Sequence, residues 1–181
     1  MFRTVELQKI INLSDADGLK RQIDNFSSLN YDVEYFIRHK AVDYEKRAFC
    51  RTFLVVDENI HIVGFFTLGL KNLAFQDYVS NSKKKSIHGI SSDVSSVPVI
   101  LIGQLSKNLA CDNAISGEEL LDFAIDMVYN AQDIVGGRIC LVETATDEEN
   151  QKVIEFYENC GFVKLQKDEN GEYQQLYKKI K

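Results

Sequence analysis

The sequence predicts an α/β protein with a mixed sheet, and three observations support this fold class. The nearly unbroken apolar run at 97–105 is typical of a strand buried on both faces. A helical pattern at 116–131 and a second apolar run at 139–142 follow it, so the three segments form a βαβ unit with parallel strands. Apolar segments on either side of short polar turns, within 49–70 and 162–180, predict two antiparallel hairpins.

Composition limits the class of protein. The chain has 181 residues, 45% of them hydrophobic and 27% charged, which is typical of one globular domain covering residues 1–181. No apolar run approaches the roughly 18 residues that span a bilayer, and the first residues lack a signal-peptide pattern. We therefore expect a cytoplasmic protein without membrane contact. The net charge of −6 argues against a generally basic nucleic-acid binder. No cysteine pair has metal-site spacing, so no metal is expected.

The N-terminal part predicts one strand and two helices. Residues 4–11 are apolar enough for a strand, although their alternation is imperfect. Ser14, with Asp17 three residues later, resembles a capping box that opens a helix to about Phe26. A second helix should begin near Asp32, where apolar residues recur at helical spacing. Its exposed face would carry basic side chains, namely Arg38, His39, Lys40, Lys46 and Arg47.

The next segment predicts a hairpin and then a long loop. Strands at 49–56 and 60–70 flank the polar turn 57–59. Residues 80–96 are rich in Ser, Asn and Lys and hold few large apolar residues, so we expect a loop with at most a short helix before it. A loop of this length is either disordered or functional, for instance a lid over a substrate. The triplet Lys83 to Lys85 gives it a local positive charge.

The central strand leads into a site that suits an anion. A polar loop follows the strand, and Ser116 with Glu119 three residues later predicts the start of the next helix. Free backbone N–H groups at a helix N-terminus, beyond the carboxyl end of a strand, favour an anionic ligand. Further on, Thr146 with Glu149 predicts the cap of a last helix that ends at Gly161.

At this point the residues carry a resemblance to a known family. The run 150–162, NQKVIEFYENCGF, resembles the last motif of the GNAT superfamily of acyl-CoA N-acyltransferases. The strand 97–106, VPVILIGQLS, resembles one branch of that superfamily, the acetyltransferase toxins of bacterial toxin–antitoxin pairs. The segments 51–57 and 62–68 resemble the preceding hairpin of the same branch. The resemblance extends from Tyr44 to Phe162, with the elements in the same order and at the same spacing.

The resemblance implies a fold and a cofactor. The GNAT fold has a mixed, mostly antiparallel sheet with a central pair of splayed parallel strands and flanking helices. Its cosubstrate is acetyl-CoA. In this chain the resemblance assigns the pantetheine arm to the backbone of Leu105, Ser106 and Lys107, and a further contact to Asn150. It assigns the pyrophosphate to the loop Asp112, Asn113, Ala114, Ile115, Ser116 and Gly117.

The resemblance also implies a chemistry. Tyr157 would face the thioester sulfur, where a weakly acidic phenol can protonate the departing thiolate. Backbone N–H groups at the strand end would polarise the thioester carbonyl as its oxyanion forms. The acceptor amine must lose a proton, and Glu143, near the end of the second parallel strand, is the best carboxylate candidate. Access of solvent to the amine would make a base unnecessary.

The pyrophosphate loop departs from the family pattern. Asp112 stands where Gln or Arg is expected, and Ile115 replaces a glycine whose missing side chain lets the backbone approach phosphate. The Ser116 capping box would also satisfy N–H groups that a pyrophosphate needs.

Three functions follow from these patterns. The first is an acetyl-CoA-dependent transfer of an acetyl group to a primary amine by direct attack. The second is a toxin of a toxin–antitoxin pair that acetylates aminoacyl-tRNA. It would have tRNA and an antitoxin protein as partners, and the basic residues above could contact the tRNA. The third is a non-catalytic GNAT-fold binding or regulatory domain with a degraded pyrophosphate loop. A homodimer is open in each case.

Overall fold

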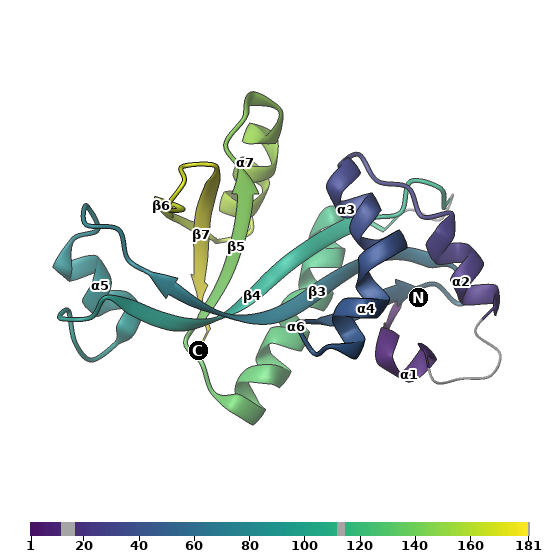
Figure 1. The fold of residues 1–181 in the computed structure, drawn as a ribbon, viewed down its shortest axis with the longest axis horizontal. Coiled ribbons are helices and arrows are strands. Elements are labelled where there is room, and N and C mark those ends of the chain that lie inside the picture. Colours follow the sequence, from purple (N-terminus) through teal and green to yellow (C-terminus); the bar gives the residue numbers. More distant parts are fainter. Residues whose placement is uncertain (12–16, 112–114, 181) are drawn as a thin grey trace. The chain divides into compact units, whose positions relative to one another are not determined.

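The computed structural model describes residues 1–11, 17–111 and 115–180 (Figure 1). The chain forms two compact units: unit 1 comprises Met1–Gly69 and Gly103–Met127, and unit 2 comprises Leu70–Ile102 and Val128–Lys181. Three elements run through both units, namely β3 (Ile62–Ala74), β4 (Ser96–Lys107) and α6 (Gly117–Val135). That residues 1–181 are one domain stays a prediction.

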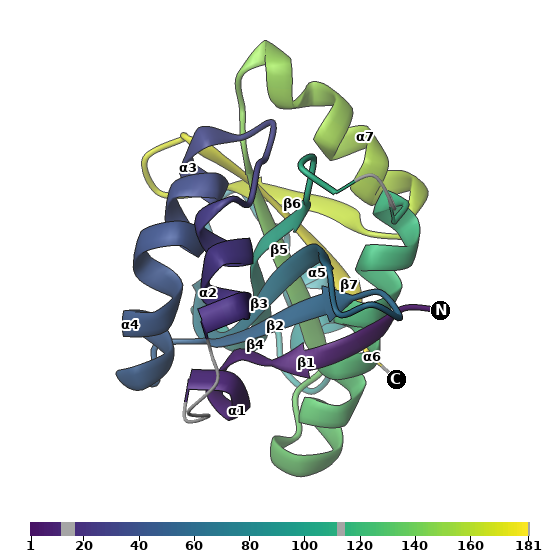
Figure 2. The same ribbon diagram turned by 90° about the vertical axis from the view of Figure 1, so that its right-hand side faces the viewer.

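Unit 1 is a sheet covered by helices on both faces. Its strand order is β1 (Arg3–Glu6), β2 (Arg51–Val56), β3 and β4. Strands β1 and β2, and then β2 and β3, pair antiparallel. Figures 1 and 2 show helices α1 to α4 on one face of these strands and α6 on the other. The side chains of Thr52–Val56 on β2 and Ile62–Leu68 on β3 are buried on both faces.

The predicted strand at 4–11 is wrong beyond its first residues. β1 ends at Glu6, and a short helix, α1 (Leu7–Ile11), follows directly. Leu7 is buried in the core of unit 1, and Ile10 and Ile11 pack against the same cluster. Spacings of three and four residues place these side chains on one helical face, whereas a strand would have divided them between two faces.

The two predicted helices that follow are present. The first is α2 (Asp17–Asp24); Ser14, its predicted cap, lies outside the described residues. The second consists of α3 (Tyr31–Tyr35), a π-helical turn η1 (Phe36–Lys40) and α4 (Ala41–Lys46). Its start near Asp32 is confirmed, with Asn30 as the capping residue. The π-helical turn was not predicted.

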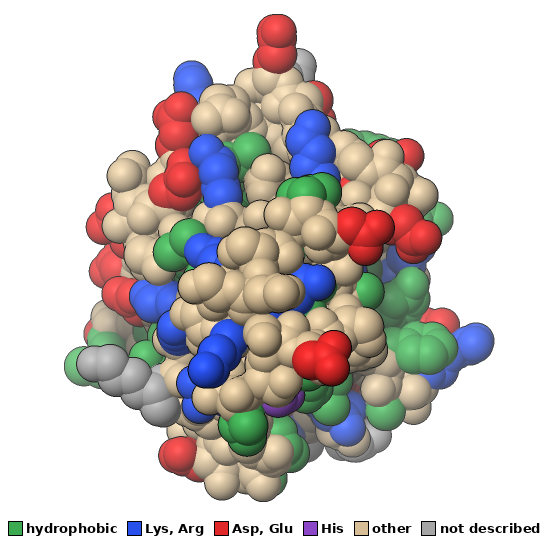
Figure 3. Space-filling view, turned by 90° about the vertical axis from the view of Figure 1, so that its left-hand side faces the viewer, with side chains coloured by type: hydrophobic (Ala, Val, Ile, Leu, Met, Phe, Trp, Pro, Cys, Tyr) green, Lys and Arg blue, Asp and Glu red, His purple; other side chains and the backbone are tan. Residues whose placement is uncertain are grey.

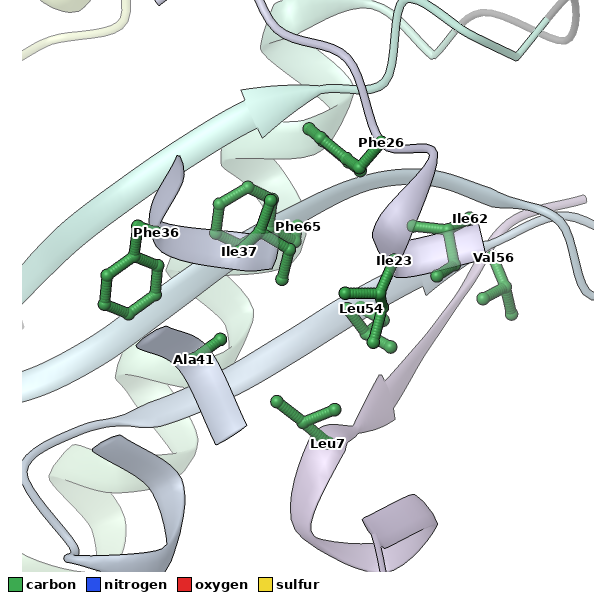
Figure 4. Close-up of a cluster of buried hydrophobic side chains, with 10 residues drawn as sticks. All are labelled: Leu7, Ile23, Phe26, Phe36, Ile37, Ala41, Leu54, Val56, Ile62 and Phe65. Atoms are coloured by element: carbon green, nitrogen blue, oxygen red, sulfur yellow. The ribbon is translucent and has the colours of Figure 1, made fainter. Parts of the chain in front are cut away.

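The core of unit 1 lies between these helices and the sheet (Figure 4). Phe26, two residues after the end of α2, packs edge to face against Phe65 of β3 at a ring-centroid distance of 5.2 Å. The buried carboxylate of Glu45 in α4 accepts hydrogen bonds from Arg51 and from the backbone of Thr52, both on β2. The buried side chains of the cluster are Leu7, Ile23, Phe26, Phe36, Ile37, Ala41, Leu54, Val56, Ile62 and Phe65.

The hairpin between β2 and β3 is confirmed. The buried Asp57 side chain fixes the turn, because its Oδ1 accepts the backbone N–H groups of Asn59 and His61 at 2.9 and 2.8 Å. β3 is longer than predicted and continues to Ala74. The added length carries the strand from unit 1 into unit 2.

Unit 2 contains the predicted parallel pair. Its strand order is β3, β4, β5 (Ile139–Ala145), β7 (Tyr173–Lys179) and β6 (Val163–Lys167). β4 and β5 are parallel, as the βαβ pattern predicted, and β5–β7 and β6–β7 are antiparallel. One apolar cluster of this unit consists of Leu73, Ile87, Val97, Val99, Ile139, Leu141 and Tyr177.

The predicted loop at 80–96 is wrong, because it contains the helix α5 (Asn81–His88). Ser80 caps the helix by accepting the Lys83 N–H, and Gly89 ends it with φ +90°. Ile87 is completely buried in the apolar cluster of unit 2. A helix with a single buried apolar side chain has no apolar stripe, so the sequence shows no helical periodicity in this segment.

The last helix begins later than predicted. Asp147, and not Thr146, is the capping residue of a short 3₁₀ turn, η2 (Glu148–Asn150), which leads into α7 (Gln151–Asn159). Thr146 donates instead to the carbonyl oxygens of Gly171 and Glu172. Gly161 has φ +86°, as its predicted position after the helix requires. None of the described helices is both long enough and apolar enough to cross a membrane.

Candidate active site

The end of β4 directs alternate backbone groups toward β3 and away from it. In unit 1 the N–H of Gln104 donates to Thr67 Oγ1 at 2.9 Å and that of Asn108 to Val63 O at 2.8 Å, so both point toward β3. Backbone groups alternate along a strand, and those of Leu105 and Lys107 therefore point to the opposite edge. Within unit 2, the last pair of the parallel ladder between β4 and β5 is Ile102 with Val142.

Ser106 has a different place from its two neighbours. A Cβ atom at Gly64 of β3 would lie only 3.0 Å from the Ser106 carbonyl oxygen, so this carbonyl faces β3. Its hydroxyl contacts Ser28 Oγ at 2.9 Å and the Lys107 carbonyl oxygen at 2.9 Å. Of the three predicted strand-end residues, Leu105 and Lys107 thus direct backbone groups away from β3, whereas the Ser106 hydroxyl already has Ser28 and the Lys107 carbonyl as partners.

Asn108 holds the end of β4 in place. Its side chain, in a residue only 8% exposed, donates to Ile62 O at 2.8 Å and accepts the N–H groups of Ser27 and Ala110 at 3.1 and 3.0 Å. One amide therefore connects β3, the segment after α2 and the loop after β4. Sequence analysis missed this residue, because an Asn in a polar loop gives no sign of burial.

The start of α6 has the predicted capping box. The Ser116 N–H donates to Glu119 Oε2 at 3.0 Å, and the Glu119 N–H donates to Ser116 Oγ at 3.1 Å. The hydrogen bond from the Ser116 backbone, and then that from its side chain, lower the pKa of Glu119. Ile115 is buried and Gly117 is the first helical residue. The other predicted loop residues, Asp112, Asn113 and Ala114, lie outside the described residues.

Tyr157 lies on the buried side of α7. Its ring packs against Phe156 and Phe162 at centroid distances of 5.3 and 5.4 Å, and burial raises the pKa of the phenol well above its ordinary value. The hydroxyl makes no hydrogen bond within the described ranges. This phenol is protonated at neutral pH and free to donate.

Asn150 is tied to the turn before α7. Its side-chain Nδ2 and its backbone N–H both donate to Asp147 Oδ1, at 2.7 and 2.9 Å. No described residue donates to its side-chain oxygen, which leaves that acceptor for a ligand.

Glu143 has partners that the sequence did not reveal. Lys71 Nζ on β3 lies 2.7 Å from both carboxylate oxygens, and Gln175 on β7 donates to Oε1 at 2.7 Å. The buried Gln166 on β6 donates in turn to Gln175 Oε1 at 2.8 Å. Nothing in the strand pattern distinguished Lys71 as a partner, since the contact joins residues 72 positions apart.

The basic residues proposed for nucleic acid are divided between the units. In unit 1, Arg38 pairs with Glu34 and Arg47 with Asp43, so part of that charge is neutralised. In unit 2, the α5 lysines are not ion-paired to described residues; Lys83 lies over the Tyr177 ring and Lys84 over Phe75. Figure 3, which faces the α5 side, shows Lys and Arg side chains on this face with Asp and Glu beside them. No metal-binding cluster occurs in the described part of the chain.

Solved structures match the chain over nearly its whole length, whereas no family model and no characterised protein sequence matches it significantly. AtaT complexed with acetyl-methionyl-tRNAfMet is 20% identical, with a TM-score of 0.71 over 99% of this chain and 95% of that chain. A tyrosine-to-phenylalanine mutant of KacT is 19% identical, with a TM-score of 0.70 over 98% and 94%. AtaTR bound with AcCoA is 20% identical, with a TM-score of 0.64 over 98% and 92%.

These matches confirm the predicted fold. The chain has the GNAT fold, with a mostly antiparallel sheet, a central parallel pair β4–β5 and flanking helices.

Proposed function

We propose that the protein is an N-acetyltransferase that transfers an acetyl group from acetyl-CoA to a primary amine by direct attack. The observation that carries the proposal is the end of β4, where the backbone groups of Leu105 and Lys107 point away from β3, in a fold whose solved relatives include one bound with AcCoA. An extended ligand with amide groups can add to such an edge as a further strand does. The pantetheine arm of acetyl-CoA has that chemistry.

Each predicted residue then has a role that its surroundings permit. Leu105 and Lys107 bind the pantetheine amides through their backbone, and Ser106 contributes its hydroxyl. The N-terminus of α6 and the preceding loop take the pyrophosphate, and the Asn150 oxygen accepts a donor of the cofactor arm. The Tyr157 phenol protonates the departing thiolate, and Glu143 contacts the amine. The strand-end N–H groups stabilise the oxyanion.

The capping box at α6 is the main argument for the non-catalytic alternative. The N–H groups of Ser116 and Glu119 already have partners, and the Glu119 carboxylate adds negative charge where a pyrophosphate would bind. Because its lowered pKa keeps that carboxylate ionised throughout the neutral range, the repulsion persists at neutral pH. Acetyl-CoA must displace these contacts, so we expect weaker binding than an open helix start would give.

The first prediction concerns binding. Acetyl-CoA at 100 times its Kd should add about 2.7 kcal/mol to the free energy of unfolding, which raises Tm by roughly 5 to 10 °C in a chain of this size. Differential scanning fluorimetry checks this shift. ADP shares the nucleotide and pyrophosphate but lacks the pantetheine arm, so it should shift Tm far less. An unchanged Tm at millimolar acetyl-CoA would favour the non-catalytic domain.

Transfer itself is tested with radiolabelled acetyl-CoA. The purified protein is incubated separately with spermidine, glycinamide, a peptide with a free α-amine and a pool of charged tRNA, and label in the product is counted. Acetylation of any of these amines supports the proposal, and the pattern identifies the acceptor class. Binding without transfer to any acceptor would contradict it.

A second candidate is a toxin that acetylates aminoacyl-tRNA. The specific observation in its favour is that a solved structure of the same fold is complexed with acetyl-methionyl-tRNAfMet. A face of unit 2 that carries Lys83, Lys84 and Lys85 on α5 could contact the phosphates of such an RNA. An antitoxin protein would be its partner, as AtaR is for AtaT. A homodimer stays a prediction.

The toxin has a sharp cellular test. Induction of the wild-type chain in bacteria without a partner should arrest growth, because acetylated aminoacyl-tRNA is withdrawn from ordinary use. Induction of the Tyr157→Phe variant to the same level should not. Colony counts after induction, with protein levels checked by blotting, measure the difference. Normal growth with abundant wild-type protein would contradict the toxin function and leave the general acetyltransferase proposal standing.

A further inference from the structure

The apolar cluster of unit 2 ends in polar side chains on three neighbouring elements of the sheet. Each of these polar residues lies two positions along its own strand from a member of that cluster and therefore on the same face of the sheet. They are Lys71 on β3, Glu143 on β5 and Gln175 on β7. Glu143 directly follows Val142, the last β5 residue paired with β4. The group therefore lies where the parallel ladder ends.

The carboxylate of Glu143 is held rigidly. Lys71 Nζ lies 2.7 Å from Oε1 and from Oε2, and Gln175 Nε2 donates to Oε1. Gln175 is fixed by Gln166, whose Nε2 donates to Gln175 Oε1 and to the carbonyl oxygen of Ala74. β4 and α5 contribute apolar side chains to this face. In the described part of the chain, Lys71 is the one charged group that forms an ion pair with Glu143.

One oxygen keeps capacity for a further donor. Oε1 accepts from both Lys71 and Gln175, whereas Oε2 accepts from Lys71 alone among the described residues. A carboxylate oxygen has two lone pairs, so Oε2 can accept one more hydrogen bond. The Glu143 side chain is 19% exposed, so it is not closed off from solvent.

Tyr157 lies on the other face of the same strand. Burial and then the charge of the Cys140 thiol raise the pKa of its phenol, and Cys140 and Glu143 are an odd number of positions apart on β5. Alternation along the strand therefore places the phenol and the carboxylate on opposite faces. A thioester approached by Tyr157 from one face would be open to an amine from the Glu143 face.

We propose that Lys71 selects the neutral, nucleophilic form of the amine substrate, which binds by donating an N–H to Glu143 Oε2. The inference deepens the proposed function and rests on it. Glu143 alone would attract an ammonium ion, which has no lone pair for attack. With the Lys71 ammonium on the same carboxylate, a second positive charge is disfavoured, and the pKa of the bound amine is lowered.

The chemical step balances with these groups. The amine nitrogen forms a bond to the thioester carbonyl carbon, and the carbon–sulfur bond then breaks. The nitrogen of the tetrahedral intermediate gives its extra proton to Glu143 Oε2, which passes it to solvent. The departing thiolate takes the phenolic proton of Tyr157, which the phenol regains from solvent. The products are the amide and free CoA thiol.

The test is the pH dependence of kcat for glycinamide, with acetyl-CoA and the amine both saturating, in the wild type and in Lys71→Met, because kcat reports the ionisation of the bound amine. Without Lys71, the unpaired Glu143 favours the ammonium form, so the acid limb of the profile should move upward by about one pH unit. The kcat of Lys71→Met at pH 7 should be about tenfold below that of the wild type, and the two should become equal at a pH above the acid limb. Lys71→Arg keeps the charge and should restore the wild-type profile.

Two controls separate this role from a structural one. Trifluoroethylamine is already neutral at pH 7, so Lys71→Met should leave its rate there unchanged. Lys164→Met, which removes a lysine paired with Glu158 in the same unit, should not move the profile. An equal loss at every pH, or with both amines, would overturn the proposal. If wild-type protein acetylates neither amine nor methionyl-tRNA, the proposed function itself fails, which is a different result from an unshifted limb.

Discussion

Tyr157→Phe should lower kcat by at least about 100-fold while leaving the Kd for acetyl-CoA within about twofold of wild type. The phenol has no hydrogen-bond partner within the described ranges, and its ring packs against Phe156 and Phe162. Phenylalanine keeps the ring contacts and removes only the proton donor. Burial raises the pKa of this phenol, so the wild type should not lose activity through its ionisation at moderately alkaline pH.

The measurement pairs steady-state kinetics with calorimetric titration of acetyl-CoA. Tyr177→Phe is the matched control: it also removes a phenol oxygen from a buried residue of unit 2, but from the opposite face of the sheet, and its turnover should not change. A Tyr157→Phe variant with wild-type turnover would remove the residue from the mechanism. A loss of acetyl-CoA affinity equal to the loss of turnover would assign it to binding instead.

The order of the secondary structure could be predicted from the sequence wherever a period repeats. The βαβ unit of β4, α6 and β5, the hairpins and the glycine that ends α7 depend on local patterns of several residues. α5 could not be predicted in this way, because one buried side chain, Ile87, holds it. The segment 4–11 was ambiguous, because so short an apolar run fits the period of a helix as well as that of a strand.

The candidate site could be predicted only where a motif carried it. Tyr157 and Asn150 stand in the 150–162 motif, and the capping box at Ser116 was visible from its spacing. The residues that hold the site were missed. Lys71 and Gln175 reach Glu143 from 72 and 32 positions away, and such contacts depend on the arrangement of strands and leave no local pattern. The roles assigned to all of these residues stay predictions.

Asn108→Ala should destabilise the protein by about 3 kcal/mol, because one buried and two partly buried hydrogen bonds to the backbone are lost together. The side chain satisfies the Ile62 carbonyl and the N–H groups of Ser27 and Ala110. A buried polar group left without a partner costs about 1 to 3 kcal/mol, and alanine can replace none of these bonds. For a chain of this size the loss corresponds to a fall in Tm of about 10 °C.

The same substitution should weaken acetyl-CoA binding, since Asn108 fixes the strand end whose Leu105 and Lys107 are proposed to bind the pantetheine arm. Thermal melts with and without acetyl-CoA measure both effects in one experiment. Asn72→Ala is the matched control, because its amide makes one exposed bond to Ser96 Oγ and its loss should change Tm very little. A destabilised Asn108→Ala variant that keeps the full acetyl-CoA shift would show that this strand end does not bind the cofactor, since its anchoring and the affinity would then be independent.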